Sequence, residues 1–240
     1  MATSLEIIHV PNASSTMEVA RERFNAQTYG LIVADSQTGG RGTRGRDWLS
    51  PPGNLYLTVS LPLIGLPANR LKHFALEAGL NLLLAIESIL PSIHHGRLQI
   101  KWPNDLLLND KKIAGLLIEI HGNRVLVGAG INIDSPPLLY DGGREAAGLR
   151  DLGIHIDLGM PIAKYYAELL VEALLSDWTP LNTPQMLSSW SQRALWGKSM
   201  KLRNRDGQPQ VIPLRLTPDG HLVVRHETGA EEVLISEYLF

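Results

Sequence analysis

Apolar residues recur at helical spacing in two long segments of the chain. In residues 69–90 and 161–178 they fall three or four positions apart, which places them on one face of a helix. Both segments are therefore predicted to be amphipathic helices that pack on a core. Shorter helices are predicted over residues 15–24 and 183–195, the first opened by Ser15 and Glu18 at capping-box spacing.

Between these helices, short apolar runs predict the strands of a largely antiparallel sheet, over residues 5–10, 31–34, 55–61, 98–108, 113–120 and 125–133. Pro11 and Pro62 are expected to end the first and third strands, and Pro103 to force a bulge or an edge position in the fourth. Tight turns at 109–110 and 122–123 predict that the last three strands pair in order, which gathers their polar residues. These residues are Lys101, Asn104, Asp105, Lys112 and Asn132.

After Gly197 the pattern changes to four short strands, over residues 200–202, 212–216, 222–225 and 232–235, with turn-like pairs between them. We therefore divide the chain into a first domain of residues 1–196 and a second of residues 197–240. The second has too little core to be very stable alone, so we expect it to dock on the first.

Composition narrows the classes of function. The chain is 44% hydrophobic and 19% charged, as in ordinary globular proteins, and its formal charge of −2 gives no general attraction to nucleic acid or anionic membranes. It has no cysteine, which excludes disulfides, thiolate metal sites and cysteine nucleophiles. With no signal-peptide pattern and no apolar run near the ~20 residues of a membrane span, a cytoplasmic location is expected.

One polar stretch carries candidate chemistry. Residues 37–48 read QTGGRGTRGRDW, and we call this segment the glycine–arginine loop. Glycines let backbone N–H groups turn inward around an anion, and arginines add planar donors suited to phosphate or carboxylate. Taken alone, the stretch fits a solvated glycine-rich turn equally well.

Four motifs follow one another along the chain: GRGTRGRDW at 40–48, KWPND at 101–105, KIAGLLIE at 112–119 and GAGIN at 128–132. In order and spacing they resemble the biotin protein ligases, over nearly the whole chain. The resemblance implies an α+β fold of class II synthetase type, with a mixed sheet packed with helices and an SH3-like β-barrel at 197–240. Because the motifs begin at Ser15, the resemblance is to the short form without an N-terminal DNA-binding domain, and no specific DNA is expected as a partner.

The resemblance also implies a reaction. Biotin carboxylate attacks the α-phosphate of ATP to give biotinyl-5′-AMP, and a lysine of a biotin carboxyl carrier protein then displaces AMP. Mg²⁺ is the expected companion of ATP. Both steps gather negative charge, so positioned cations matter more than a nucleophile of the enzyme. The oligomeric state is left open, a homodimer included.

Matching the motifs residue by residue implies a role for each position. Lys112 and Arg41 are the expected catalytic cations, both also touching biotin, and Asp105 is the expected ligand of Mg²⁺. The other expected biotin-binding residues are Ser15, Thr16, Met17, Gln37, Gly40, Gly42, Thr43, Gly115, Gly128 and Gly130. The expected nucleotide-binding residues are Arg44, Arg46, Trp48, Asn104 and Asn132. Simpler interpretations stay open for Ser15, as a helix cap, and for Lys112, as a solvent-facing turn lysine.

The chain departs from the family pattern at Thr43, where arginine is common, and at Met17, where asparagine is common. Both departures put the strength of biotin and adenylate binding in question. The rival interpretation is a ligase of the same superfamily for lipoate or another acyl acid. Octanoyl transferases need a cysteine that this chain lacks, and a noncatalytic biotin-binding protein leaves Lys112 and the arginines unexplained.

Overall fold

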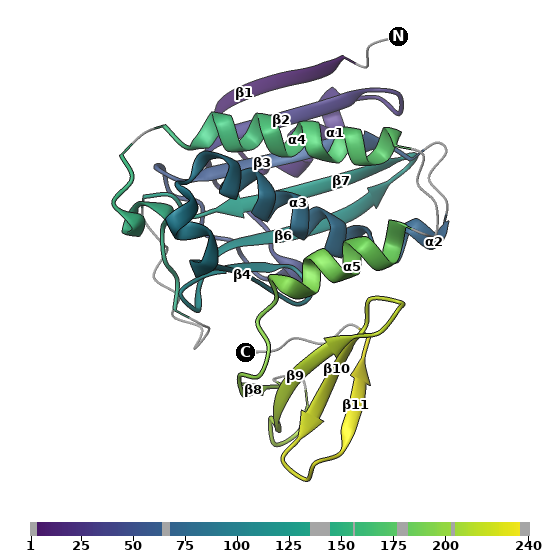
Figure 1. Ribbon diagram of the computed structural model, residues 1–240. Helices are drawn as coiled ribbons and strands as arrows, with labels where there is room; N and C mark the ends of the chain where they lie inside the picture. Colours follow the sequence, from purple (N-terminus) through teal and green to yellow (C-terminus); the bar gives the residue numbers. More distant parts are fainter. Residues whose placement is uncertain are drawn as a thin grey trace.

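The computed structural model describes residues 4–63, 68–134, 145–155, 157–176, 182–202 and 205–235 (Figure 1). Seven strands form one mixed sheet in the order β1-β2-β3-β7-β6-β5-β4. Only β1 and β2 run parallel, and the other neighbours are antiparallel. The strands are β1 (Leu5–Ala13), β2 (Tyr29–Gln37), β3 (Leu55–Pro62), β4 (Leu98–Lys101), β5 (Asp105–Leu108), β6 (Lys111–His121) and β7 (Arg124–Ile131).

Helices cover both faces of this sheet. Helices α3 (Phe74–Ile89) and α4 (Gly159–Leu175) lie side by side across one face, with α5 (Asn182–Gln192) beside α3 (Figure 1). Helix α1 (Thr16–Arg23) packs on the other face. The side chains of β2 alternate between the two faces of the sheet. Leu31 and Val33 pack with α3 and α4, whereas Ile32 packs with α1. Among the described residues, no helix combines the length and apolar character that crossing a bilayer demands.

Pro62 ends β3 as expected, as its last residue. Two other expected element boundaries are wrong. Strand β1 continues past Pro11 to Ala13, which an edge strand permits because one side of its backbone needs no partner. The long helix predicted at 69–90 is broken into α2 (Ala68–Leu71) and α3, and His73 between them bonds through Nε2 to the Pro218 carbonyl at 3.0 Å.

The single strand expected at 98–108, with a bulge or an edge position at Pro103, is also wrong, because Pro103 lies in a turn. The apolar run 98–108 forms two antiparallel strands, β4 and β5, joined by a tight turn that contains a cis Trp102–Pro103 peptide. Lys101 and Asp105 therefore face each other across the hairpin as register partners instead of lying along one strand. The turn brings the two charged side chains closer than a single strand would.

A second antiparallel sheet forms the C-terminal part, in agreement with the expected SH3-like segment. Its strands are β8 (Met200–Lys201), β9 (Gln210–Leu216), β10 (Leu222–His226) and β11 (Glu231–Leu234). Their buried side chains join the core cluster of the first sheet and its helices, and β9 contacts α5. The expected docking is thus present in the structure, while the division at residue 197 stays a prediction.

Arg124 ties α1 to the start of β7 from a buried position, with 6% of its surface exposed. Its guanidinium donates to the carbonyl of Ala20 at 2.9 Å and to that of Arg21 at 3.1 Å, at the C-terminal end of α1. Arg124→Met is expected to lower the free energy of unfolding by about 2–4 kcal/mol, because it removes the donor to the Arg21 carbonyl and leaves the Ala20 carbonyl with the backbone N of Phe24 alone. Urea unfolding measures the loss. The control Arg225→Met removes a half-exposed arginine and should change stability by less than about 0.5 kcal/mol; equal losses would contradict the argument.

Candidate functional site

The first polar cluster forms where α1 begins and β2 ends. Thr16 donates to Gln37 Oε1 from its backbone N at 2.8 Å and from Oγ1 at 3.2 Å. Thr58 Oγ1 donates to Thr16 Oγ1 at 2.9 Å, and Gln37 Nε2 donates to Ser50 Oγ at 2.9 Å. Ser15 and Thr16 are almost fully buried. The sequence analysis missed Thr58 and Ser50, which complete this network of donors and acceptors.

Ser15 is a helix cap, but not through the expected capping box. Its Oγ accepts from the backbone N of Met17 at 3.3 Å. The Glu18 carboxylate does not return to the cap and instead accepts from both Arg21 and Arg41. Glu18 therefore joins α1 to the glycine–arginine loop, a role that the capping spacing concealed.

The glycine–arginine loop is closed by its own backbone. Gly42 N donates to the Arg46 carbonyl at 2.7 Å, and Trp48 N donates to the Gly40 carbonyl at 2.9 Å. A Cβ at Gly40 would lie 2.5 Å from the Trp48 carbonyl oxygen, so a side chain has no room there. Thr43 begins the short 3₁₀ helix η1 (Thr43–Gly45) at the tip of the loop. The side chain of Arg44 lies outside the described residues, and that of Arg46 is exposed.

The Trp48 side chain packs on the sheet where glycines leave the strand backbone without side chains. Gly115 on β6 and Gly130 on β7 are register partners, and a Cβ at Gly130 would lie 2.3 Å from Trp48 Nε1. At Gly128 a Cβ would lie 3.0 Å from Met17 Sδ. The space at these glycines is therefore occupied by the Trp48 and Met17 side chains, and their expected contact with biotin stays a prediction.

The second polar cluster joins β4, β5 and β6. Lys112 Nζ lies 2.6 Å from Asp105 Oδ1, and Lys101 Nζ lies 3.4 Å from Asp105 Oδ2. The Lys112 ammonium also lies 5.0 Å from the centroid of the Trp48 ring, within cation–π range. Lys112 therefore sits between a carboxylate and an aromatic face, which rules out the solvent-facing turn lysine. Lys101, which the sequence analysis left without a role, is 4% exposed and shares this carboxylate.

Two asparagines fasten the backbone around the second cluster. Asn104 Nδ2 donates to the Leu116 carbonyl at 2.7 Å, and the Asn104 carbonyl accepts from Leu116 N at 3.0 Å. Asn132, 3% exposed, donates from Nδ2 to the Lys112 carbonyl at 3.3 Å. The strands thus bring together the five polar residues that the predicted hairpins were expected to gather.

Asp105 does not offer a ready metal site. Both of its oxygens face lysine ammonium groups. Among the described residues, no three His, Cys, Asp or Glu side chains gather as a metal site requires. A magnesium ion here would depend mainly on oxygens carried by a bound phosphate chain, since it keeps few protein ligands in such sites. The residues present do not fit a metal by themselves.

The ionisation of Asp105 follows from its partners. Burial opposes the charged carboxylate, but the charges and hydrogen bonds of Lys112 and Lys101 outweigh it, so the pKa of Asp105 lies below its ordinary value. A lowered carboxyl pKa gives stability that is fully present above the unfolded-state pKa of about 3.9 and is lost as the pH falls through the folded-state pKa.

We therefore expect the difference in unfolding free energy between the wild-type protein and Asp105→Asn to stay constant from about pH 7 to about pH 5 and to shrink only below about pH 4. Urea unfolding across this range measures it. A difference that grows as the pH falls from about 7 to about 5 would mean that burial dominates and the pKa of Asp105 is raised. Glu145→Gln, at an exposed carboxylate paired with Lys111, serves as control.

Comparisons with known proteins agree with this geometry. A sequence model of the biotin/lipoate A/B protein ligase family matches residues 10–135, more than half of the chain. The biotin–[acetyl-CoA-carboxylase] ligase of Mycobacterium tuberculosis is 27% identical over 97% of this chain and 86% of its own.

Two solved structures align over almost the full length. The biotin protein ligase of Leishmania major in complex with biotin is 30% identical, with a TM-score of 0.70, and 98% of this chain and 99% of that chain are covered. The biotin protein ligase of Aquifex aeolicus in complex with biotin and ATP is 26% identical, with a TM-score of 0.74, and 98% and 97% are covered. The fold, the two polar clusters and these likenesses lead to one conclusion: the chain belongs to the biotin/lipoate A/B protein ligase family.

Proposed function

We propose that this protein is an ATP-dependent biotin protein ligase that forms biotinyl-5′-AMP and transfers biotin to a lysine of a carboxylase carrier domain. The observation that carries the proposal is the position of Lys112, held between Asp105 and Trp48 on glycine-lined strands. Relatives named as biotin ligases, in complexes with biotin and with biotin and ATP, support the substrates.

In the first step, a carboxylate oxygen of biotin bonds to the α-phosphorus of ATP, and the bond to pyrophosphate breaks. Negative charge grows on the phosphoryl oxygens, and the Lys112 ammonium is placed to stabilise it. Asp105 fixes the direction of that ammonium, so little reorganisation is needed during the reaction. Arg41, at the base of the loop, offers a second cation to the same charge once it leaves Glu18. Oxygens of the ATP phosphates, rather than protein side chains, would hold a Mg²⁺ ion, and its charge would offset part of theirs.

In the second step, the neutral amine of the carrier lysine attacks the carbonyl carbon of the mixed anhydride. An amide forms, the amine gives up a proton, and AMP leaves with the electrons of the broken C–O bond. The glycine–arginine loop would cover the anhydride between the two steps and keep water away from it.

The cluster of Ser15, Thr16 and Gln37 favours biotin over a linear acyl acid. A cyclic urea presents two N–H donors and a carbonyl acceptor, and hydroxyl and amide groups can satisfy both kinds. The hydroxyl and amide groups of this cluster already bond to one another, and a cyclic urea could extend that network whereas a hydrocarbon chain could not. The named relatives support the same choice and not lipoate.

A carboxylase carrier domain is the proposed protein substrate, because the M. tuberculosis relative is named for acetyl-CoA carboxylase. The absence of specific DNA binding and the cytoplasmic location stay predictions, and the oligomeric state stays open.

The test of the proposal is an acid-dependent pyrophosphate-exchange assay with biotin, lipoate and octanoate at equal concentration. Exchange with biotin alone supports the proposal, and exchange with lipoate or octanoate above biotin would overturn it. Transfer of biotin to a purified carboxylase carrier domain, with the same domain carrying arginine at its acceptor lysine as control, tests the second step.

A further inference from the structure

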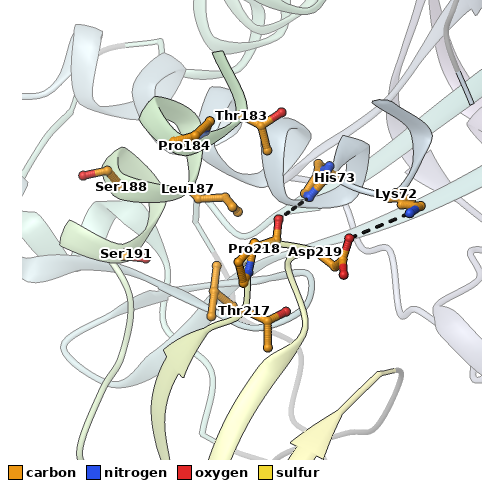
Figure 2. Close-up of a pocket in the computed structure, with 11 residues that line it drawn as sticks. Lys72, His73, Thr183, Pro184, Leu187, Ser188, Ser191, Thr217, Pro218 and Asp219 are labelled. Carbon is orange, nitrogen blue, oxygen red and sulfur yellow. Dashed lines mark hydrogen bonds and ion pairs between the residues drawn. The ribbon is translucent and has the colours of Figure 1, made fainter. Parts of the chain in front are cut away.

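The C-terminal sheet reaches the first sheet through the turn between β9 and β10, residues 217–220, which we call the docking turn. Two of its carbonyls accept bonds from nearly buried rings, that of Pro218 from His73 Nε2 at 3.0 Å and that of Gly220 from Trp102 Nε1 at 3.1 Å. Figure 2 shows the docking turn reaching His73 and Lys72, with α5 across a pocket of about 570 Å³. The turn therefore binds specific groups of the first domain.

The docking turn has a glycine, Gly220, at the point where it contacts α3 and His73. Gly220 has φ +78°, a conformation that favours glycine. A Cβ there would lie 2.9 Å from Leu76 Cδ1 and 3.2 Å from the His73 ring, so a side chain would push the turn away from α3. Gly229 in the same sheet has φ +85° but no atom within 4 Å of such a Cβ. The two glycines share backbone strain and differ in contact with the first domain.

The segment held by the docking turn leads directly to the charged cluster. Trp102 follows Lys101, and on the other side Ile100 bonds through both backbone groups to the segment after α5, with Ile100 N to the Arg193 carbonyl at 2.8 Å and Leu195 N to the Ile100 carbonyl at 2.9 Å. Lys101 is thus anchored on both sides by the C-terminal part of the chain. From Lys101 the contacts continue to Asp105 and then to Lys112.

We propose that Trp102 is a positioning residue through which the docking turn sets the Lys101–Asp105–Lys112 cluster for adenylation. The inference rests on the proposed function for its kinetic test. When the indole N–H loses its acceptor, the ring shifts, and the hairpin that carries Lys101 and Asp105 shifts with it. A small displacement of a positioned cation costs a large part of its effect on rate.

The kinetic test compares three variants by pyrophosphate exchange. Trp102→Phe keeps a ring and removes the N–H, and Gly220→Ala displaces the docking turn. Both are expected to lower kcat/KM for ATP by about tenfold, the equivalent of one buried hydrogen bond to a fixed acceptor. The KM for biotin should rise less than the KM for ATP, because Thr16 and Gln37, which are also expected to bind biotin, lie toward the opposite end of the sheet. Gly229→Ala is the matched control and should resemble wild type.

The outcomes separate positioning from a general loss of structure. Folded Trp102→Phe and Gly220→Ala proteins with unchanged kcat/KM for ATP would overturn the proposal. Equal rises in the KM for ATP and the KM for biotin would also overturn it. So would a loss of kcat/KM for ATP in Gly229→Ala equal to that in Gly220→Ala. If Gly220→Ala does not fold, Trp102→Phe decides the matter alone.

A second measurement needs no substrate and therefore stands if the proposed function fails. Lys112, 24% exposed on its side chain, should be acetylated slowly by acetic anhydride relative to the exposed Lys164, with mass spectrometry as readout. Trp102→Phe and Gly220→Ala should raise the ratio of Lys112 to Lys164 labelling severalfold, and Gly229→Ala should not. Equal ratios in all four proteins would overturn the proposal. Absence of biotin-dependent exchange in the wild-type protein would overturn the proposed function only.

Discussion

Replacing Lys112 with alanine is expected to lower biotin-dependent pyrophosphate exchange by about a hundredfold to a thousandfold. Loss of one donor aimed at transition-state charge costs about 2.7–4 kcal/mol, which corresponds to this factor. The Lys112 ammonium is fixed by Asp105 and lies over the face of Trp48, so another cation cannot take its place without moving the cluster. Lys101 also pairs with Asp105, but it lies on β4, on the opposite side of β5 from Lys112.

The neighbouring lysine supplies the matched control. Lys111 is half exposed and pairs with the exposed Glu145, so Lys111→Ala should exchange pyrophosphate within about twofold of wild type. Lys111→Ala should unfold in urea near the wild-type midpoint. Lys112→Ala should unfold at a lower midpoint, because Asp105 loses one of its two lysine partners, but should be folded in the absence of urea, where exchange is measured. Near-normal exchange by a folded Lys112→Ala protein would remove Lys112 from the mechanism, whereas equal losses in the two variants would point to the strand rather than the ammonium.

Changing Thr43 to arginine is expected to reduce the escape of biotinyl-5′-AMP by about tenfold to a hundredfold. The family resemblance implies that an arginine at this position would close over the adenylate, and Thr43 lies at the tip of the glycine–arginine loop. A threonine cannot supply a charged donor, and such a hydrogen bond contributes about 1.5–3 kcal/mol. Each 1.4 kcal/mol corresponds to roughly a factor of ten in retention.

Escaped adenylate is measured by biotin labelling of a bystander protein, such as serum albumin, in the presence of biotin and ATP. The wild-type protein should label the bystander more than Thr43→Arg does at equal rates of adenylate formation. Arg44→Ala tests the competing arrangement, in which the neighbouring arginine supplies the contact. Equal labelling by wild type and Thr43→Arg, together with a sharp rise in Arg44→Ala, would reject leakage through Thr43.

Much of the fold could be predicted because apolar periodicity is local. It located the strands of both sheets and the two long helices, since each pattern depends on one element and one core. It could not distinguish a bent strand from a hairpin at Pro103, because Lys101 and Asp105 keep the same parity in both. The break at His73 was equally invisible, because the bond that accompanies it comes from Pro218, 145 residues further along the chain.

For the site too, features set by the local sequence could be predicted, whereas contacts between distant segments could not. Motif order drew attention to Lys112, Trp48 and the strand glycines, which the structure places close together. The positions of Lys112 and the glycines follow from strand pairing, whereas Trp48 lies on the loop, and the binding roles of all of them stay predictions. Contacts between side chains of different elements could not be predicted. Glu18 has the spacing of a capping residue, yet its carboxylate pairs with Arg41 on the glycine–arginine loop. The sharing of Asp105 between two lysines likewise depends on a turn geometry that the apolar pattern does not encode.

The pairing of residues 193–195 with Ile100 also bears on the solubility of the protein. Strand β4 is the last strand of the seven-stranded sheet, and an uncovered last strand offers its free N–H and carbonyl groups to another molecule. Arg193 and Leu195 occupy those groups at Ile100. The segment that leads to the C-terminal sheet therefore blocks strand addition between copies, and a chain cut ahead of it would lose this protection and aggregate through β4.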